Sequence, residues 1–164
     1  MMDKMGGMLR YGIPQYRLPK EVLDSEIKII EKTGVRLCNN VKLGRDITIE
    51  NLKSVNDAVI LAPGAWKSTP MRVKGEDTQG VYGGIDFLRS VIQGKAVEIG
   101  EKVAVCGGGN TAMDACRTAV RLGAKEVYVI YRRTEKEMPA EEIEIKESKE
   151  EGVTYKFLTN PLEI

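Results

Sequence analysis

The sequence predicts an α/β fold built around a strand–helix–strand unit in the second half of the chain. A short apolar segment, residues 103–106, runs directly into three consecutive glycines. A stripe of small residues at helical spacing follows, and Leu122-Gly123 is a typical helix end. The β-branched and aromatic residues 127–131 then predict a second strand. This order of elements is typical of a parallel βαβ unit.

The turn after the first strand fits the pattern G-x-G-x-x-G/A. Its residues are Gly107, Gly108, Gly109, Asn110, Thr111 and Ala112. In such a turn Gly107 allows the tight bend, Gly109 lets a pyrophosphate approach the backbone, and Ala112 lets the helix pack closely. Unpaired N–H groups at the helix N-terminus attract phosphate. We therefore predict a dinucleotide-binding, Rossmann-like unit; the alternative is a structural βαβ unit with an incidental glycine turn.

The helix after this turn has two predicted faces. Thr111 and Asp114 have the spacing of a capping box. The packed face is expected to carry small and apolar residues, namely Ala112, Ala115, Cys116, Ala119 and Val120. Met113, Arg117 and Arg121 are expected on the other side.

Two arginines, Arg132 and Arg133, follow the second strand. A site for NAD or FAD usually has an acidic residue about 20 residues past the glycines, where it binds a ribose 2′-hydroxyl. Guanidinium groups instead suit a 2′-phosphate, through charge-assisted hydrogen bonds. The alternative is a solvated basic pair on a loop. The position favours phosphate recognition, so the predicted cofactor is NADP(H).

Composition excludes several classes of function. The 164 residues carry 25 basic and 24 acidic side chains, so net charge predicts no nucleic-acid or membrane partner. No apolar run approaches the length of about 20 residues that a membrane helix needs, and no signal peptide is evident. The chain has no histidine, which excludes histidine-based catalysis, and its three cysteines do not form a C-x-x-C metal pair. We expect no metal site and a reduced, cytoplasmic protein, with Cys106 and Cys116 as buried thiols.

The remaining elements are predicted from periodicity and from turn residues. Residues 6–19 are expected to be largely irregular, and Thr48 to cap a brief helix. The expected helices are 20–32, 85–92 and a charged, largely exposed one from Pro139 to about residue 151. The expected strands are 35–41, the buried parallel type 58–62, and 153–158. A polar connection, residues 66–80, separates two domains.

Three segments together resemble a known family: GGMLRYGIPQYRLPKEVLDSEI, DAVILAPGA and the stretch from Val103 to Ala140. They are similar to the small (beta) subunit of glutamate synthase, an FAD-linked, NAD(P)-dependent oxidoreductase with two dinucleotide-binding domains. The flavin portion of dihydropyrimidine dehydrogenase and the larger subunit of NADH-dependent ferredoxin–NADP oxidoreductases share these motifs. The resemblance implies part of an FAD-type α/β domain over residues 1–75 and part of an NADP-binding Rossmann-like domain over 76–164.

The resemblance also implies roles for individual residues. Residues 107–112 would hold the NADPH pyrophosphate, and the arginine pair would hold its 2′-phosphate. Gly64 and Ala65 stand where the family's A-x-G-A segment passes the flavin, with Pro63 in place of the usual threonine. The family's cysteine-ligated iron–sulfur clusters, its own flavin fingerprint and its closing G-D motif are missing from this sequence. The chain is therefore expected to be an internal fragment that binds FAD poorly or not at all.

Three functions follow as hypotheses. In the first, the chain is part of a subunit that passes a hydride from NADPH to FAD. Electrons then pass through iron–sulfur centres to a large partner subunit for glutamate synthesis, and no side chain of this chain acts as a catalytic acid or base. In the second, the chain binds NADP(H) without turnover. In the third, it is a folding fragment whose open sheet edge pairs with another copy.

Overall fold

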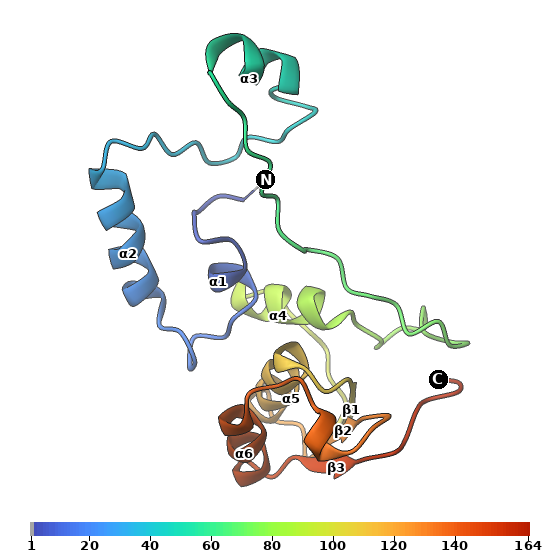
Figure 1. Cartoon of the computed structure of the whole chain (residues 1–164). Coiled ribbons are helices and arrows are strands. Elements are labelled where there is room, and N and C mark those ends of the chain that lie inside the picture. Colours follow the sequence, from blue (N-terminus) through green and yellow to red (C-terminus); the bar gives the residue numbers. More distant parts are fainter. Residues whose placement is uncertain (1) are drawn as a thin grey trace. The chain divides into compact units, whose positions relative to one another are not determined.

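The computed structural model describes residues 2–164, which divide into two compact units. The first unit ends at Trp66, and the second is Lys67–Ile164. Figure 1 shows the strands of the sheet in the yellow-to-red part of the chain, and helices without strands in the blue part. Within the described part of the chain, no helix is both long enough and apolar enough to cross a membrane.

A three-stranded parallel sheet forms the base of the second unit, which confirms the predicted α/β class. Its strands are β1 (Lys102–Cys106), β2 (Glu126–Ile130) and β3 (Thr154–Lys156), in the order β1-β2-β3. The β1–β2 register runs from Lys102 opposite Glu126 to Cys106 opposite Ile130. All three strands therefore end at the same edge, and the turn and loops that carry the predicted site begin there.

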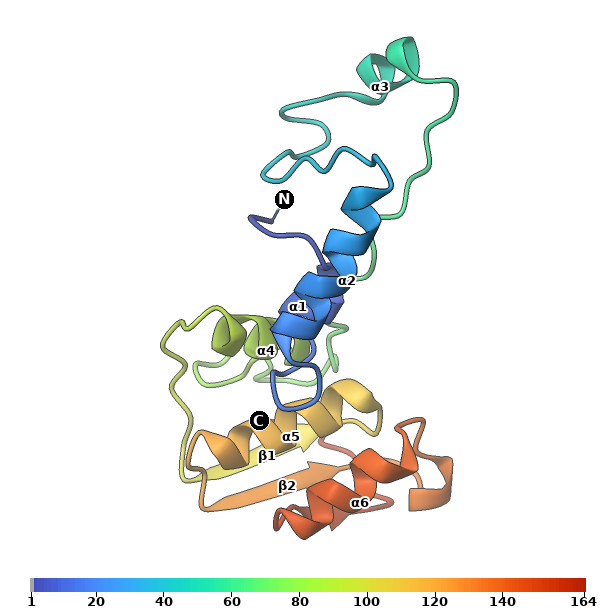
Figure 2. The same cartoon turned by 90° about the vertical axis from the view of Figure 1, so that its left-hand side faces the viewer.

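Helix α5 (Asn110–Arg121) lies at the centre of this unit. It packs against β1, β2, α4 (Gly84–Ile92) and α6 (Glu142–Glu150), and Figure 2 shows it running across β1 and β2. The predicted small-residue stripe is buried, with Cys116 and Ala119 fully enclosed and Val120 half-buried. Of the residues predicted on the other side, Met113 and Arg117 are also buried, at 0% and 5% exposed, whereas Arg121 is exposed. Neighbours on several sides leave α5 little free surface.

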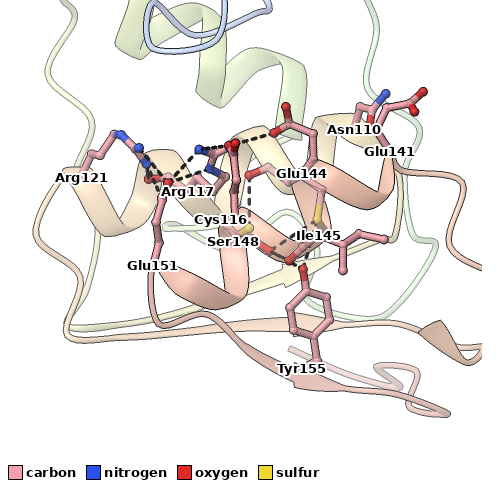
Figure 3. A network of polar contacts seen from close by, with 12 residues as sticks. Asn110, Cys116, Arg117, Arg121, Glu141, Glu144, Ile145, Ser148, Glu151 and Tyr155 are labelled. Atoms are coloured by element: carbon pink, nitrogen blue, oxygen red, sulfur yellow. Dashed lines mark hydrogen bonds and ion pairs between the residues drawn. The ribbon is translucent and has the colours of Figure 1, made fainter.

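Ion pairs join α5 to α6 and bury part of the predicted exposed helix. Arg117 Nη2 lies 2.7 Å from Glu147 Oε2 and 2.8 Å from Glu151 Oε1, and Arg121 also pairs with Glu151 (Figure 3). The hydrogen bond from Arg121, reinforced by Arg117, holds the pKa of Glu151 below its ordinary value. The acidic run of α6 is thus partly a packing surface: its charges meet arginines of a neighbouring helix.

Two of the three cysteines were expected to be buried, and only Cys116 is. Burial raises the pKa of its thiol to about 12. Cys106 is exposed, because it is the last residue of β1 and lies at the open edge of the sheet.

The C-terminal elements are shorter than predicted. Helix α6 begins at Glu142 rather than at Pro139, since Glu141 has an extended backbone with a ψ of 136° and serves as the N-cap. A 3₁₀ turn, Glu135–Glu137, lies in the predicted loop. β3 ends at Lys156, two residues before Leu158 adopts a positive φ of 53°.

The first unit contains three helices in its described residues. They are α1 (Gly7–Tyr11), α2 (Lys20–Lys32) and α3 (Ile49–Val55). α1 falls in the segment expected to be irregular; α2 has the predicted bounds. The predicted cap on α3 is confirmed, because Thr48 and Asn51 form a capping box.

The two strands predicted for this unit are not formed. Residues 35–41 lack strand structure, and the apolar run 58–62 is extended but unpaired, with Ile60 89% and Leu61 59% exposed. A buried parallel strand needs hydrogen-bonded neighbours and helices on its faces. No other strand exists in the described residues of this unit to supply the pairing.

Candidate functional site

The glycine turn leaves the carboxyl end of β1 and bends sharply into α5. Gly107 has a φ of +147°, a conformation that side chains disfavour, and its N–H donates to the Ile130 carbonyl at 3.0 Å. A Cβ atom on Gly107 would touch the Cβ of Ala112 at 3.5 Å. The geometry agrees with the predicted roles of Gly107 in the bend and of Ala112 in close helix packing.

The predicted capping box on α5 was wrong. The N-cap is Gly109, which lacks a side chain, so Thr111 and Asp114 lie inside the helix, Thr111 exposed and Asp114 buried. Among the described residues, nothing accepts a hydrogen bond from the backbone N–H groups of residues 108–111. A helix N-terminus with several free N–H donors fits a negatively charged oxygen ligand.

A hollow of about 180 Å³ lies beside this turn, at the carboxyl edge of the sheet. Its lining comes from the ends of β1 and β2, from the segment after β3 and from the segment before α4: Met71, Val73, Cys106, Gly107, Ile130, Tyr131, Arg132, Asn160 and Pro161. Sequence reasoning missed Met71, Val73, Asn160 and Pro161. For Asn160 and Pro161 a topological signal was available, since the residues that follow parallel strands gather at one edge of the sheet. Met71 and Val73 follow no strand of this sheet, so that signal does not apply to them.

The two predicted arginines have different positions. Arg132 lines the hollow together with Gly107, whereas Arg133 does not line it. Both side chains are exposed, and neither forms an ion pair within residues 2–164. Two positive charges without protein partners fit a phosphate ligand, and Arg132 is the one placed beside the glycine turn.

Gly108 is needed for a reason that the motif did not predict. A Cβ atom there would lie 2.6 Å from Cε2 of Tyr131, so the ring occupies the space of a side chain. The Tyr131 hydroxyl donates to the Glu137 carbonyl at 2.8 Å. Tyr131 therefore connects the glycine turn with the loop that carries the arginines.

Asn110 makes a second such connection. Its Oδ1 accepts the Glu141 N–H at 2.9 Å, and the neighbouring Ala140 N–H donates to the Gly108 carbonyl at 3.1 Å (Figure 3). Sequence reasoning placed Asn110 against a pyrophosphate and did not anticipate this contact, which links positions 31 residues apart.

Gly64 and Ala65 lie in the first unit and are exposed. Gly64 has a φ of +73°, and the turn is closed by Trp66, whose Nε1 donates to the Pro63 carbonyl at 2.8 Å. The preceding apolar run is exposed as well. These residues alone offer a flavin an open surface rather than an enclosed pocket.

Comparison with known proteins gives the family. Residues 8–164 match the pyridine nucleotide-disulphide oxidoreductase family, almost the whole chain. The chain belongs to this family. The name of this family refers to pyridine nucleotides, the class of cofactor that the glycine turn and the arginines predict.

Several curated relatives match over nearly the full chain. NADPH-Fe(3+) oxidoreductase subunit beta of Geobacter sulfurreducens is 48% identical over 162 residues, covering 97% of this chain and 24% of the relative. NADP(+)-dependent formate dehydrogenase subunit beta of Moorella thermoacetica is 46% identical, covering 95% and 22%. Glutamate synthase [NADPH] small chain of Escherichia coli K12 is 39% identical, covering 98% and 36%. Glutamate synthase small chains are therefore relatives, but proteins with other named activities are more similar.

The solved structures confirm the fold. FprA of Mycobacterium tuberculosis in complex with NADPH superposes with a TM-score of 0.81 at 21% identity, covering all of this chain and 52% of that one. The chain spans about a quarter to a third of the length of the curated relatives above.

Proposed function

We propose that the chain is part of an electron-transfer subunit of an NADPH-dependent flavin oxidoreductase, and that residues 76–164 hold NADP(H). The main support is that the free N–H groups of residues 108–111 directly follow Gly107, and that Gly107 lines the same hollow as Arg132, whose guanidinium is unpaired among the described residues. A pyrophosphate fits the first feature and a 2′-phosphate the second. The relatives whose names include NADPH or NADP(+) agree with this choice.

In this proposal the chain's own residues bind and orient. Gly107 and Gly109 keep the turn free of side chains, the N–H groups of residues 108–111 donate to phosphate oxygens, and Arg132, with Arg133 nearby, meets the 2′-phosphate. When bound, the nicotinamide supplies a hydride and the flavin accepts it. No side chain of this chain is assigned a proton-transfer role.

The flavin belongs to the proposed complete enzyme rather than to this chain alone. The family implies FAD, and Gly64 and Ala65 are the proposed flavin-facing residues, but their open surroundings do not enclose an isoalloxazine ring. We expect the chain to bind FAD weakly or not at all. A purified chain that is yellow with stoichiometric flavin would contradict this expectation.

The relatives support two candidates for the partner subunit and the final electron acceptor. Identities of 46–48% to two beta subunits favour delivery of electrons to another subunit of a complex such as theirs. Glutamate synthesis with a large partner subunit is the second candidate, supported by the 39% identity over 98% of the chain. We propose a cytoplasmic location for either complex, and self-association through the open edge of β1 as the alternative state of the isolated chain.

A calorimetric titration of the purified chain with NADPH, and in parallel with NADH, tests the proposal. Binding of NADPH at least about tenfold tighter than NADH is expected, since hydrogen bonds to a charged group contribute about 1.5–3 kcal/mol. Equal affinity would refute the 2′-phosphate role. In the complete enzyme, NADPH oxidation dependent on ferric iron, or on glutamine with 2-oxoglutarate, would distinguish the two acceptors.

A further inference from the structure

The loop between β2 and α6 is held against the glycine turn by contacts at two places. At its centre, the Tyr131 hydroxyl donates to the Glu137 carbonyl at 2.8 Å. At its end, the Glu141 N–H donates to Asn110 Oδ1 at 2.9 Å, beside the bond from Ala140 N–H to the Gly108 carbonyl at 3.1 Å. Figure 3 shows Asn110 and Glu141 facing each other at the starts of their helices.

Only two side chains of this loop are buried. Residues 132–137 are exposed, and in residues 132–141 only Met138 and Ala140 are buried, each 8% exposed. The arginines lie at the exposed beginning of the loop, before either anchor. Their placement depends on the bond from the Leu158 N–H to the Arg133 carbonyl at 3.2 Å, on the ion pair of Glu135 with Lys149 on α6, and on the polar contacts with the glycine turn.

We propose that Asn110 is a positioning residue for cofactor selection: its carboxamide fixes the end of the loop of residues 132–141 to the glycine turn, which helps to keep Arg132 beside Gly107 at the hollow. The inference rests on the proposed function and assigns to the Asn110 side chain a task other than pyrophosphate contact. One residue of α5 then sets the distance between the pyrophosphate donors and the 2′-phosphate cation. Loss of this bond should loosen the loop and reduce, but not abolish, the preference for NADPH over NADH.

Three variants of the full chain test the role. Asn110→Ala removes the acceptor, and Asn110→Asp keeps an acceptor for the Glu141 N–H. Asn56→Ala is the matched control, because its side chain makes only a local bond to the Leu52 carbonyl at 2.8 Å in the first unit. Each variant is titrated with NADPH and with NADH, and hydrogen exchange is followed at the amides of residues 140 and 141.

For Asn110→Ala we expect the NADPH-to-NADH affinity ratio to fall about three- to tenfold, the effect of one neutral hydrogen bond, with faster exchange at Glu141. For Asn110→Asp we expect weaker binding of both nucleotides, because a carboxylate is placed beside the phosphate donors, but an unchanged ratio. The control should match the parent chain in both measurements. Unchanged exchange in β1 and β2 would show that the Ala variant is folded.

Failure of the positioning role and failure of the proposed function give different results. A ratio unaffected by Asn110→Ala, with or without faster exchange, would overturn the positioning role and leave the proposed function standing. Equal affinity of the parent chain for NADPH and NADH would overturn the proposed function and, with it, the selectivity role. Unchanged Glu141 exchange in Asn110→Ala would show that the bond does not hold the loop.

Discussion

The guanidinium of Arg117 on α5 and the carboxylate of Glu144 on α6 form a buried ion pair. Their Nη1 and Oε2 atoms are 2.6 Å apart, and the two side chains are 6% and 9% exposed. The pair joins the helix that begins at the glycine turn to the helix that ends the arginine loop. The pair therefore stabilises the packing of these two helices, whose first residues border the candidate site, and it does not itself line the hollow.

Loss of Arg117 should destabilise the second unit strongly. Arg117→Met would leave the Glu144 charge buried without this partner, and we expect the free energy of unfolding to fall by about 3–5 kcal/mol. Urea denaturation followed by circular dichroism measures the change. Lys102→Met is the control, because its ion pair with Glu126 is exposed and should matter little. Equal effects of the two substitutions would show that the buried pair is not structurally important.

The stability of this helix pair should decrease in acid because of Glu151. Hydrogen bonds from Arg121 and Arg117 hold its folded pKa below the ordinary glutamate pKa of 4.5. The folded state thus binds fewer protons, so the contribution is complete above about pH 4.5 and is lost as pH falls through the folded pKa. Glu151→Gln should flatten the acid limb of a stability–pH curve. Glu150→Gln, which removes an exposed carboxylate, should keep the parent slope; the same slope in Glu151→Gln would contradict the prediction.

Alanine substitutions at Gly108 and Gly109 should have different effects on stability and on NADPH affinity. Gly108→Ala places a Cβ 2.6 Å from the Tyr131 ring, and overpacking of this kind costs about 1–3 kcal/mol. Gly109→Ala meets only Pro139 Cγ at 3.9 Å, with φ at an ordinary −96°, so stability should change little. NADPH affinity should nevertheless fall in Gly109→Ala, because the methyl group blocks the backbone approach. Thermal unfolding and NADPH titration of both variants separate the roles; a stable Gly108→Ala variant would show that Tyr131 moves freely.

The two arginines should contribute unequally. Arg132→Ala should weaken NADPH binding by roughly 10- to 100-fold, and Arg133→Ala should have a smaller effect, because only Arg132 lines the hollow. NADH affinity should stay nearly constant in both variants. Calorimetric titration with the two nucleotides provides the measurement. An equal loss for NADH and NADPH would mean that the arginines support the fold instead.

The sequence by itself determined the βαβ unit. Residues 102–133 carry a strand, a turn and a helix whose signals are local: apolar runs, glycines at fixed spacing, and small residues every three or four positions. The bend at Gly107 needs a glycine wherever the rest of the chain lies. For the same reason the arginines could be predicted to follow the second strand, although not which of them faces the hollow.

Tertiary structure alone decided the environment of these elements. Arg117 has a surface-type side chain in the sequence and is buried because α6 brings carboxylates to it from about 30 positions away. Asn110 contacts Glu141 through a loop whose path no local pattern predicts. The apolar residues 58–62 have the composition of a central strand but stay exposed, because a strand forms only when other strands are present to accept its hydrogen bonds. Local periodicity specifies an element, whereas burial and pairing depend on distant residues.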